Sequence, residues 1–354
     1  MQSHPIQVQK PARAATTCRS ESVTVVVPVR NEELYIARTL DQLLSQDVTG
    51  IDLEIVVVDG QSTDRTRQIV ERYSTRNPRV RLLDNPGRLS SAARNLAIRE
   101  SCGEYVIVVD GHCEIPSRRY LLDLVDAFQE SGADCLGRPQ PLDVSQATTL
   151  QQAIAAARSS WLGHHPDSFI YSDREVDCPA ASVAVAYRRA VFETVGTFDE
   201  RFDACEDYEL NCRIDLAGLR CRLIPKLTVR YEPRKTLGEL FRQLFRYGRG
   251  RVRLFRKHRP TLAFRTLAPA AFVAGIAAGP LLSTAMPFLW TYYIAALFVY
   301  VAVTMIESLR LALAKNRLRL LGWLPVVFWM IHFGSGCGLL WELAHRRSME
   351  PSSP

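Results

Sequence analysis

Two hydrophobic periods alternate along the first third of the chain. Nearly continuous apolar runs, rich in β-branched residues, predict strands that are buried on both faces. Helical spacing of apolar residues between these runs predicts amphipathic helices. The predicted strands lie at 23–29, 54–58, 80–83 and 105–109, and the predicted helices at 32–46, 64–73 and 89–100. This strand–helix alternation is typical of a parallel α/β sheet.

The pattern is less regular in the middle of the chain. Within 134–188 only 181–187 has the apolar run of a strand. Further on we expect a helix over 206–216 and a strand near 221–224. We therefore expect one α/β domain over 21–235, preceded by a disordered leader at 1–20.

An amphipathic pattern begins where this domain ends. In 236–255, apolar residues such as Leu240 and Leu244 share one face, and basic residues such as Arg242 and Arg246 share the other. A helix of this kind suits the membrane interface, although packing on the core of the preceding domain would give the same pattern. We expect an interface region over 236–265.

Three apolar stretches follow, at 267–286, 288–306 and 320–341. Each has about the ~20 residues that a spanning helix needs. Only Pro287 separates the first two, which favours a tight reversal or a re-entrant hairpin. The sequence predicts transmembrane or re-entrant helices over 266–342 and a tail at 343–354.

Charge placement gives these helices an orientation. The net charge is +7, and no acidic residue lies between Glu239 and Glu307. Basic residues precede the first apolar stretch and follow the second. By the positive-inside tendency, both of these flanks lie inside. The third stretch would then leave Arg346 and Arg347 outside, against that tendency, unless it is re-entrant or tilted. The basic block indicates an anionic membrane surface, and no nucleic-acid-binding motif accompanies it.

The rest of the composition concerns the compartment. The nine cysteines include no CxxC pair, which fits a reducing compartment better than a disulfide framework. The polar stretch 1–20 has no apolar core of a signal peptide, so we expect the α/β domain in the cytoplasm. The expected location is the inner membrane, multi-pass, with a cytoplasmic catalytic domain.

Four polar clusters follow the predicted elements. They are Pro-Val-Arg-Asn-Glu at 28–32, Asp-Gly-Gln-Ser-Thr-Asp at 59–64, Asp-Gly-His at 110–112 and Cys-Glu-Asp at 205–207. Taken singly, Asp-Gly is usually a turn and Ser-Thr-Asp usually a helix cap. The first three lie after strand carboxyl ends, where open α/β sheets bind ligands. No GxGxxG follows the first strand, which disfavours a dinucleotide oxidoreductase.

The motifs resemble a known family. VVVPVRNEE, VVVDGQSTD, GRLSSAARNLA, VVDGHCE, GTFDERF, ACEDYEL and QLFRY occur in the order typical of family 2 glycosyltransferases, over roughly 21–250. The resemblance implies a GT-A fold, a Rossmann-like mixed sheet flanked by helices, followed by a helical membrane region. The membrane tail is similar to that of members that build bacterial exopolysaccharide, of the succinoglycan-synthase type.

The resemblance also implies where the donor binds. Asp59 is expected to accept a hydrogen bond from the uracil or ribose of a UDP-sugar, because a carboxylate holds N–H and hydroxyl donors firmly. Pro28, Arg30 and Glu32 are expected to line the same pocket. Arg94 is expected at the diphosphate. Asp64 either contacts the donor or caps its helix.

A divalent metal, Mn²⁺ or Mg²⁺, is implied at Asp110 and His112. The family has an Asp-x-Asp motif there, and this chain has His112 in place of the second Asp. Imidazole together with carboxylate suits Mn²⁺ well and Mg²⁺ less. The alternative for His112 is a turn residue beside the donor.

The last motifs imply the acceptor side. Asp207 is expected to be the general base, with Glu206 orienting its loop or the acceptor. Gln243, Arg246 and Tyr247 look like a QxxRW motif with Tyr in place of Trp, implying contacts to the acceptor and the diphosphate. Ordinary residues of an interface helix are the alternative.

The resulting hypothesis is an inverting hexosyltransferase. It would move a hexose from a UDP-sugar to a lipid-linked saccharide in cell-surface polysaccharide synthesis, at a membrane and without nucleic acid. The alternatives are a transferase that uses polyprenyl phosphate directly and a non-catalytic membrane scaffold that keeps the fold.

Overall fold

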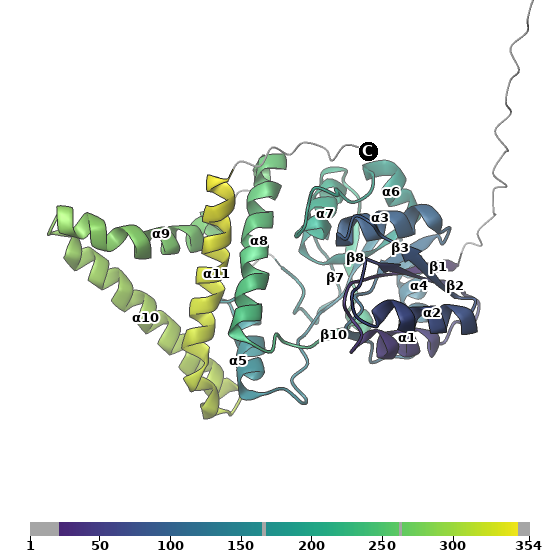
Figure 1. Cartoon of the computed structure of the whole chain (residues 1–354), viewed down its shortest axis with the longest axis horizontal. Helices are drawn as coiled ribbons and strands as arrows, with labels where there is room; N and C mark the ends of the chain where they lie inside the picture. The colour runs from purple at the N-terminus through teal and green to yellow at the C-terminus, as the bar shows by residue number, and fades with distance from the viewer. Residues whose placement is uncertain (1–20, 165–167, 262–263, 346–354) are drawn as a thin grey trace, which may run out of the picture.

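A mixed sheet domain and a group of long helices form the two ends of the molecule (Figure 1). The computed structural model describes residues 21–164, 168–261 and 264–345. The predicted leader at 1–20 and most of the predicted tail at 343–354 lie outside these residues.

The strands form two sheets in the described part of the chain. The larger has the order β3-β2-β1-β4-β8-β6-β9-β7, and the smaller pairs β10 with β5. The strands are β1 (Ser22–Val29), β2 (Asp52–Asp59), β3 (Val80–Asp84), β4 (Tyr105–Val108), β5 (Cys113–Glu114), β6 (Cys135–Gly137), β7 (Val176–Asp177), β8 (Ala184–Arg188), β9 (Cys221–Leu223) and β10 (Arg230–Tyr231).

The helices connect these strands and then continue beyond them. They are α1 (Ile36–Leu44), α2 (Thr66–Arg76), α3 (Ser90–Glu100), α4 (Tyr120–Ser131), α5 (Thr149–Arg158), α6 (Arg189–Val195), α7 (Glu206–Leu216), α8 (Leu237–Lys257), α9 (Phe264–Ala285), α10 (Leu289–Ala314) and α11 (Leu324–Ala344). Short 3₁₀ turns are η1 (Ala180–Ser182), η2 (Pro225–Leu227), η3 (Arg259–Thr261) and η4 (Leu318–Gly322).

The predicted parallel strands form the first half of the large sheet. β1 pairs in parallel with β2 and β4, and β2 with β3. β8 is antiparallel to β4, and this reversal makes the sheet mixed. The carboxyl ends of β1, β2 and β4 therefore meet at one edge of the sheet.

Side chains of β1 alternate between two cores, one on each face of the sheet. Val25 and Val27 pack with Leu40 of α1 and Phe128 of α4. Val26 packs on the other face with α3, α6 and α7. Because both faces are covered, the strands read as continuous apolar runs. The predicted mixed α/β sheet with flanking helices and a helical C-terminal region is confirmed.

The middle of the chain differs in detail from the prediction. The segment 134–188 contains α5 as well as the short strand β6, neither of which was predicted. The strand predicted over 181–187 starts only at Ala184, because Ala180–Ser182 forms a 3₁₀ turn. That turn is tied down by Asp215, whose carboxylate accepts the backbone N–H groups of Ala180 and Ala181.

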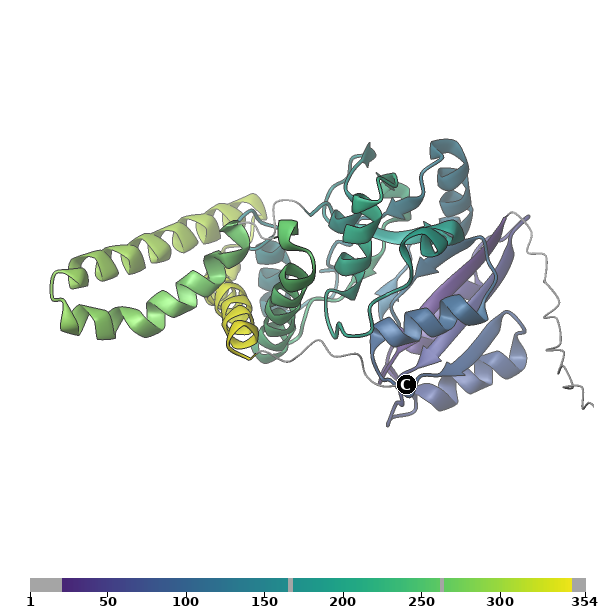
Figure 2. The ribbon, with the colours of Figure 1, turned by 90° about the horizontal axis from the view of Figure 1, so that it is seen from above.

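Three of the described helices, α9, α10 and α11, are long and apolar enough to cross a bilayer by length and composition. The helix α8 carries the predicted amphipathic pattern and packs along α11. Figure 1 and Figure 2 show α9 and α10 joined at one end and projecting away from the sheet domain. This arrangement supports association with a membrane.

Candidate active site

The residues expected to bind the donor follow three adjacent strands. Pro28 lies in β1 opposite Val58, and Val29 lies opposite Asp59 at the end of β2. Asp110 follows β4, the other parallel neighbour of β1. Arg30 is exposed at the end of β1, and Pro28 is half-buried. Parallel pairing thus brings the first three polar clusters to one edge of the sheet.

Asp59 is held firmly at this edge. Its carboxylate is 2% exposed. Oδ1 accepts the Ser62 hydroxyl at 2.5 Å, and Arg67 Nη1 lies 3.8 Å from Oδ2. The carboxylate of Asp64 accepts hydrogen bonds from the backbone N–H groups of Glu33, in the loop after β1, and of Thr66, at the start of α2. Asp64 therefore joins the β1 loop to the start of α2, as a capping residue does.

Glu32 and His112 form a pair that joins β1 to the loop after β4. Glu32 Oε1 lies 3.0 Å from His112 Nδ1. The backbone N–H of Glu32 donates to Thr66 Oγ1 at 2.7 Å. A carboxylate at one imidazole nitrogen fixes the ring orientation and leaves the other nitrogen, Nε2, to face a ligand.

Asp110 has a partner that the sequence did not reveal. The Tyr231 hydroxyl in β10 donates to Asp110 Oδ2 at 2.9 Å. Behind Tyr231 lies Arg138, which is 1% exposed and donates to the Val108 carbonyl at 3.2 Å. Arg138 Nη1 also donates to the Tyr120 hydroxyl. A fully buried arginine thus stabilises the strand end that carries Asp110.

The charges around Asp110 and His112 reinforce one another. Burial alone would raise the pKa of Asp110, but the charges of His112 and Arg94 outweigh it and lower the pKa. Burial alone would lower the pKa of His112, but the Glu32 hydrogen bond and the charge of Asp110 raise it. Asp110 is accordingly an ionised carboxylate beside a basic imidazole.

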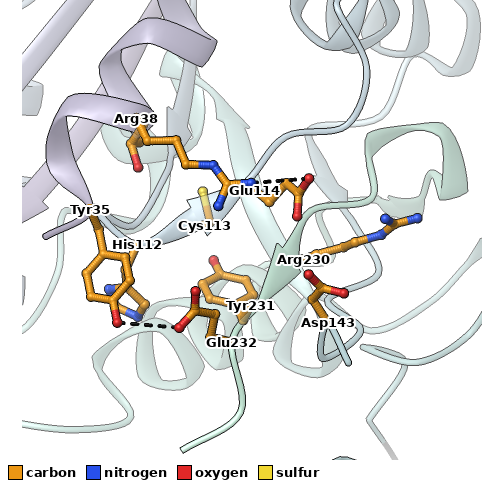
Figure 3. Close-up of a pocket in the computed structure, with 10 residues that line it drawn as sticks. Tyr35, Arg38, His112, Cys113, Glu114, Asp143, Arg230, Tyr231 and Glu232 are labelled. Carbon is orange, nitrogen blue, oxygen red and sulfur yellow. Dashed lines mark hydrogen bonds and ion pairs between the residues drawn. The ribbon is translucent and has the colours of Figure 1, made fainter. Parts of the chain in front are cut away.

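A small pocket of about 30 Å³ opens beside His112 (Figure 3). Tyr35 and Glu232 close one side of it, with their hydroxyl and carboxylate 3.4 Å apart. Arg38 and Glu114 are ion-paired at 3.4 Å across another side. This volume suits a water molecule rather than a sugar.

The two acids expected on the acceptor side, Glu206 and Asp207, lie at the start of α7. Cys205 has a φ of 63°, a left-handed conformation that turns the chain into the helix. Asp207 is exposed, and its Oδ1 accepts the backbone N–H of Tyr208 at 2.8 Å. Glu206 is only 9% exposed. Burial raises the pKa of Glu206, and the charge of Arg94 only partly offsets this.

Arg94 lies between the two groups of acids. Its Nη1 is 3.3 Å from Glu206 Oε1, and its guanidinium lies over the Phe198 ring at 5.1 Å. The pKa of Arg94 is raised: burial opposes the charge, but the fields of Glu206, Asp207 and Asp110 prevail. Arg94 is only 9% exposed, and its ion pair within the protein is with Glu206.

The motif on α8 meets the same loop. Arg246 Nη2 donates to the Asp203 carbonyl at 2.6 Å, and Gln243 Nε2 donates to the Tyr247 hydroxyl at 3.0 Å. Gly250 permits this approach, because a Cβ there would lie 2.7 Å from Cys205 Sγ. Two motifs about forty residues apart in sequence therefore form one surface next to Asp207.

A divalent metal fits the donor-side residues only in part. Asp110 and His112 supply one carboxylate and one imidazole, which suits Mn²⁺. Within the described residues, no group of three or more His, Cys, Asp or Glu side chains could hold a metal ion. Any metal here would need oxygen ligands from a bound molecule.

Comparison with known proteins agrees with this geometry. Residues 24–196 match the family model described as glycosyl transferase family 2. The chain is 37% identical over 270 residues to the succinoglycan biosynthesis protein ExoA of Rhizobium meliloti, covering 75% of this chain and 79% of that protein. It is 28% identical over 241 residues to the glycosyltransferase AglE of Haloferax volcanii, covering 68% and 76%.

A solved structure shares the fold. The mannosyltransferase PcManGT of Pyrobaculum calidifontis, solved in complex with GDP-Man and Mn²⁺, aligns with a TM-score of 0.58 and 20% identity over 92% of this chain and 88% of that one. The expected GT-A fold is confirmed. From its identity to ExoA and its match to the family model, the chain belongs to glycosyl transferase family 2 and is a glycosyltransferase.

Proposed function

We propose that this protein is an inverting glycosyltransferase that moves a hexose from a UDP-sugar to a lipid-linked saccharide during cell-surface polysaccharide synthesis. The observation that carries the proposal is the position of Arg94. Its field acts on Asp110 on one side and on Glu206 and Asp207 on the other. A donor diphosphate beside Asp110 and an acceptor hydroxyl beside Asp207 would then share one electrostatic centre.

The donor would bind along the strand ends. Asp59, held by Ser62, would accept a hydrogen bond from the base or ribose, with Pro28, Arg30 and Glu32 around it. Arg94 would act on the diphosphate through the shared field, since its guanidinium contacts Glu206. The relative PcManGT was solved with GDP-Man, so the donor panel below includes both nucleotides.

Asp110 and His112 would hold a divalent cation together with the diphosphate oxygens. Such a cation neutralises the charge that develops on the leaving group. Glu32 supports the assignment, because its bond to Nδ1 orients His112. PcManGT was solved with Mn²⁺, and the nitrogen ligand here also favours Mn²⁺ over Mg²⁺.

Asp207 would be the general base that removes the proton of the acceptor hydroxyl. It is exposed to an incoming acceptor and lies in the first turn of α7. Glu206 is buried and paired with Arg94, which suits a positioning role. Gln243, Arg246 and Tyr247 would contact the acceptor from α8.

The acceptor proposal rests on relatives and on the apolar helices. ExoA is named for succinoglycan biosynthesis. A 22% identical relative from Methanococcus voltae is named as a glucuronosyltransferase of a dolichyl N-acetyl-glucosaminyl phosphate, a lipid-linked sugar. We place the catalytic domain on the cytoplasmic face of the inner membrane, where α9, α10 and α11 bring it close to such an acceptor.

The test is hydrolysis and binding of a panel of UDP- and GDP-sugars by detergent-purified full chain, with Mn²⁺, Mg²⁺ or EDTA. We expect one UDP-hexose to be turned over with Mn²⁺ and not with EDTA. Transfer is then assayed to polyprenyl phosphate and to polyprenyl diphosphate saccharides. Transfer to the bare phosphate would replace the saccharide acceptor, and no binding of any donor would refute the catalytic proposal.

A further inference from the structure

The three apolar helices are not equivalent. In the most apolar window of each, 44% of the residues of α11 are buried inside the protein, against 17% in α9 and 6% in α10. A helix that protein covers in part depends less on a bilayer to cover its apolar side chains. The partners of α11 therefore decide its depth in the membrane.

The main partner of α11 is α8. Gly334 meets Phe241 and Leu244, Gly338 meets Phe245, and Glu342 meets Arg249, so that the two helices run parallel. A Cβ at Gly338 would lie 2.1 Å from the Phe245 carbonyl oxygen. Glycines at this four-residue spacing let two helix backbones touch.

The composition of α8 keeps it out of the hydrocarbon. Its charged residues are Glu239, Arg242, Arg246, Arg249, Arg251, Arg253, Arg256 and Lys257. An arginine at the centre of a spanning helix is strongly unfavourable, and α8 has several. Because α11 lies parallel to α8 and in backbone contact with it, α11 stays at the same depth.

Contacts at its end, middle and start fix α11 to the catalytic side, the first two polar and the last apolar. Near its end, Glu342 is 3% exposed and pairs with Arg249 at 3.1 Å and Arg253 at 2.9 Å. In its middle, His332 Nε2 lies 3.0 Å from the Leu162 carbonyl oxygen. Near its start, Leu324, Val327 and Phe328 pack in one cluster with Ile154 of α5.

The α9–α10 hairpin has the opposite character. Its exposed apolar side chains include Leu281, Leu282, Met286, Phe288, Phe298 and Val299. Figure 1 shows α8 and α11 upright and side by side while α9 runs sideways away from α11, and Figure 2 shows the hairpin projecting beyond both. The 22 residues of α9 measure ~33 Å, comparable with the ~30 Å hydrocarbon core.

The base of the hairpin is basic on both sides. Arg256, Lys257 and Arg259 precede it, and Lys315, Arg317 and Arg319 follow it. Charges at this position favour the anionic surface of one leaflet. The start of α9 and the end of α10 therefore lie at the same surface.

We propose that only the α9–α10 hairpin enters the bilayer, while α8 and α11 lie as a pair along the membrane surface on the catalytic side. The end of α11 then returns to the side that holds the sheet domain. The alternative, in which α11 crosses, would carry Glu342 and its arginines into or through the lipid.

The experiment places one epitope tag before Met1 and another after Pro354 of the full chain in a bacterial host. Protease is added to intact spheroplasts and to inverted membrane vesicles. We expect both tags to be protected in spheroplasts and both to be cleaved in inverted vesicles. Cleavage of only the C-terminal tag in spheroplasts would show that α11 crosses and would overturn the proposal.

A carbonate wash of the same membranes tests the hairpin. We expect the full chain to stay in the membrane pellet, because a surface helix pair alone would be extracted. Full release by carbonate would overturn insertion of α9 and α10. Neither readout requires sugar transfer, so both are independent of the proposed donor and acceptor.

Discussion

The two sides of the candidate site are stabilised by different forces. The donor side stands on parallel strands whose side chains, such as Val26 and Ile107, are fully buried in apolar cores. The acceptor side is formed by the loop before α7, and ion pairs connect this loop to α8 and α11. Asp203 in this loop binds Arg253 at 2.7 Å, and Arg253 also binds Glu342. Apolar burial gives one side its rigidity, and charge couples the other to α8 and α11.

The largest expected effect is on chemistry at the acceptor side. Asp207→Asn should lower kcat by about 10²–10⁴-fold, the contribution of a positioned base. Donor binding should be unchanged, because Asp207 lies on the acceptor side. Initial rates and donor titrations measure the two effects. Glu193→Gln, an exposed acid on α6, is the control, and equal rates for the two variants would exclude Asp207 as the base.

The next largest effect should come from the donor-side core. Ile107→Ala removes a fully buried side chain of β4 and should cost about 2–5 kcal/mol of unfolding free energy. The loss should be the same at low and high salt. Val176→Ala, at a position 37% exposed in β7, is the matched control. A strong salt dependence of the Ile107→Ala loss would contradict the comparison.

Glu342→Gln tests the charged side. Removing one carboxylate from Arg249 and Arg253 should cost about 1.5–3 kcal/mol, the range for hydrogen bonds to charged groups. We also expect kcat to fall while the donor KM stays constant, because the loop with Asp207 loses an anchor. Glu342→Asp should restore part of kcat. A variant that loses donor affinity and kcat equally would point to general unfolding instead.

Gly338→Ala tests the contact between α8 and α11. The added Cβ must displace the Phe245 backbone, and overpacking of this kind costs about 1–3 kcal/mol. Gly275→Ala in α9 is the control, because a Cβ there meets no atom within 4 Å. Thermal unfolding in detergent compares them. Equal melting temperatures would mean that the two helices are not in close contact.

The smallest effect should appear at acid pH. Burial would raise the pKa of Asp199, but hydrogen bonds from Arg201 and Lys257 outweigh it and hold the pKa well below its usual range. The unfolded chain therefore binds the proton more readily, and this stability is lost as the pH falls below about 4. Asp199→Asn should flatten the acid side of the stability curve. An unchanged curve would show that Asp199 contributes nothing there.

The same contrast explains what the sequence could predict. β1, β2 and β4 were predictable because buried parallel strands leave uninterrupted apolar runs, and the residues after them were predictable from strand-end position. β6 has only three residues and pairs with β8 and β9, which come much later in the chain. Short strands with distant partners carry no local pattern.

The missed site residues have the same explanation. Tyr231 reaches Asp110 because β10 pairs with β5. Arg138, directly after β6, donates to the Tyr231 hydroxyl. Neither belongs to a recognisable motif. Glu32 and His112 were both predicted at the site, but their mutual contact spans 80 residues of sequence. Pairing across the fold, rather than residue type, determines these contacts.

The chain of ion pairs from Glu342 through Arg253 to Asp203 would fix the distance between α11 and the loop before α7. It links α11, which we propose lies at the membrane surface, to the loop that precedes Asp207 by four residues. The proposed base would then work at a fixed height above the lipid, and an acceptor hydroxyl that lies at that height would receive the sugar.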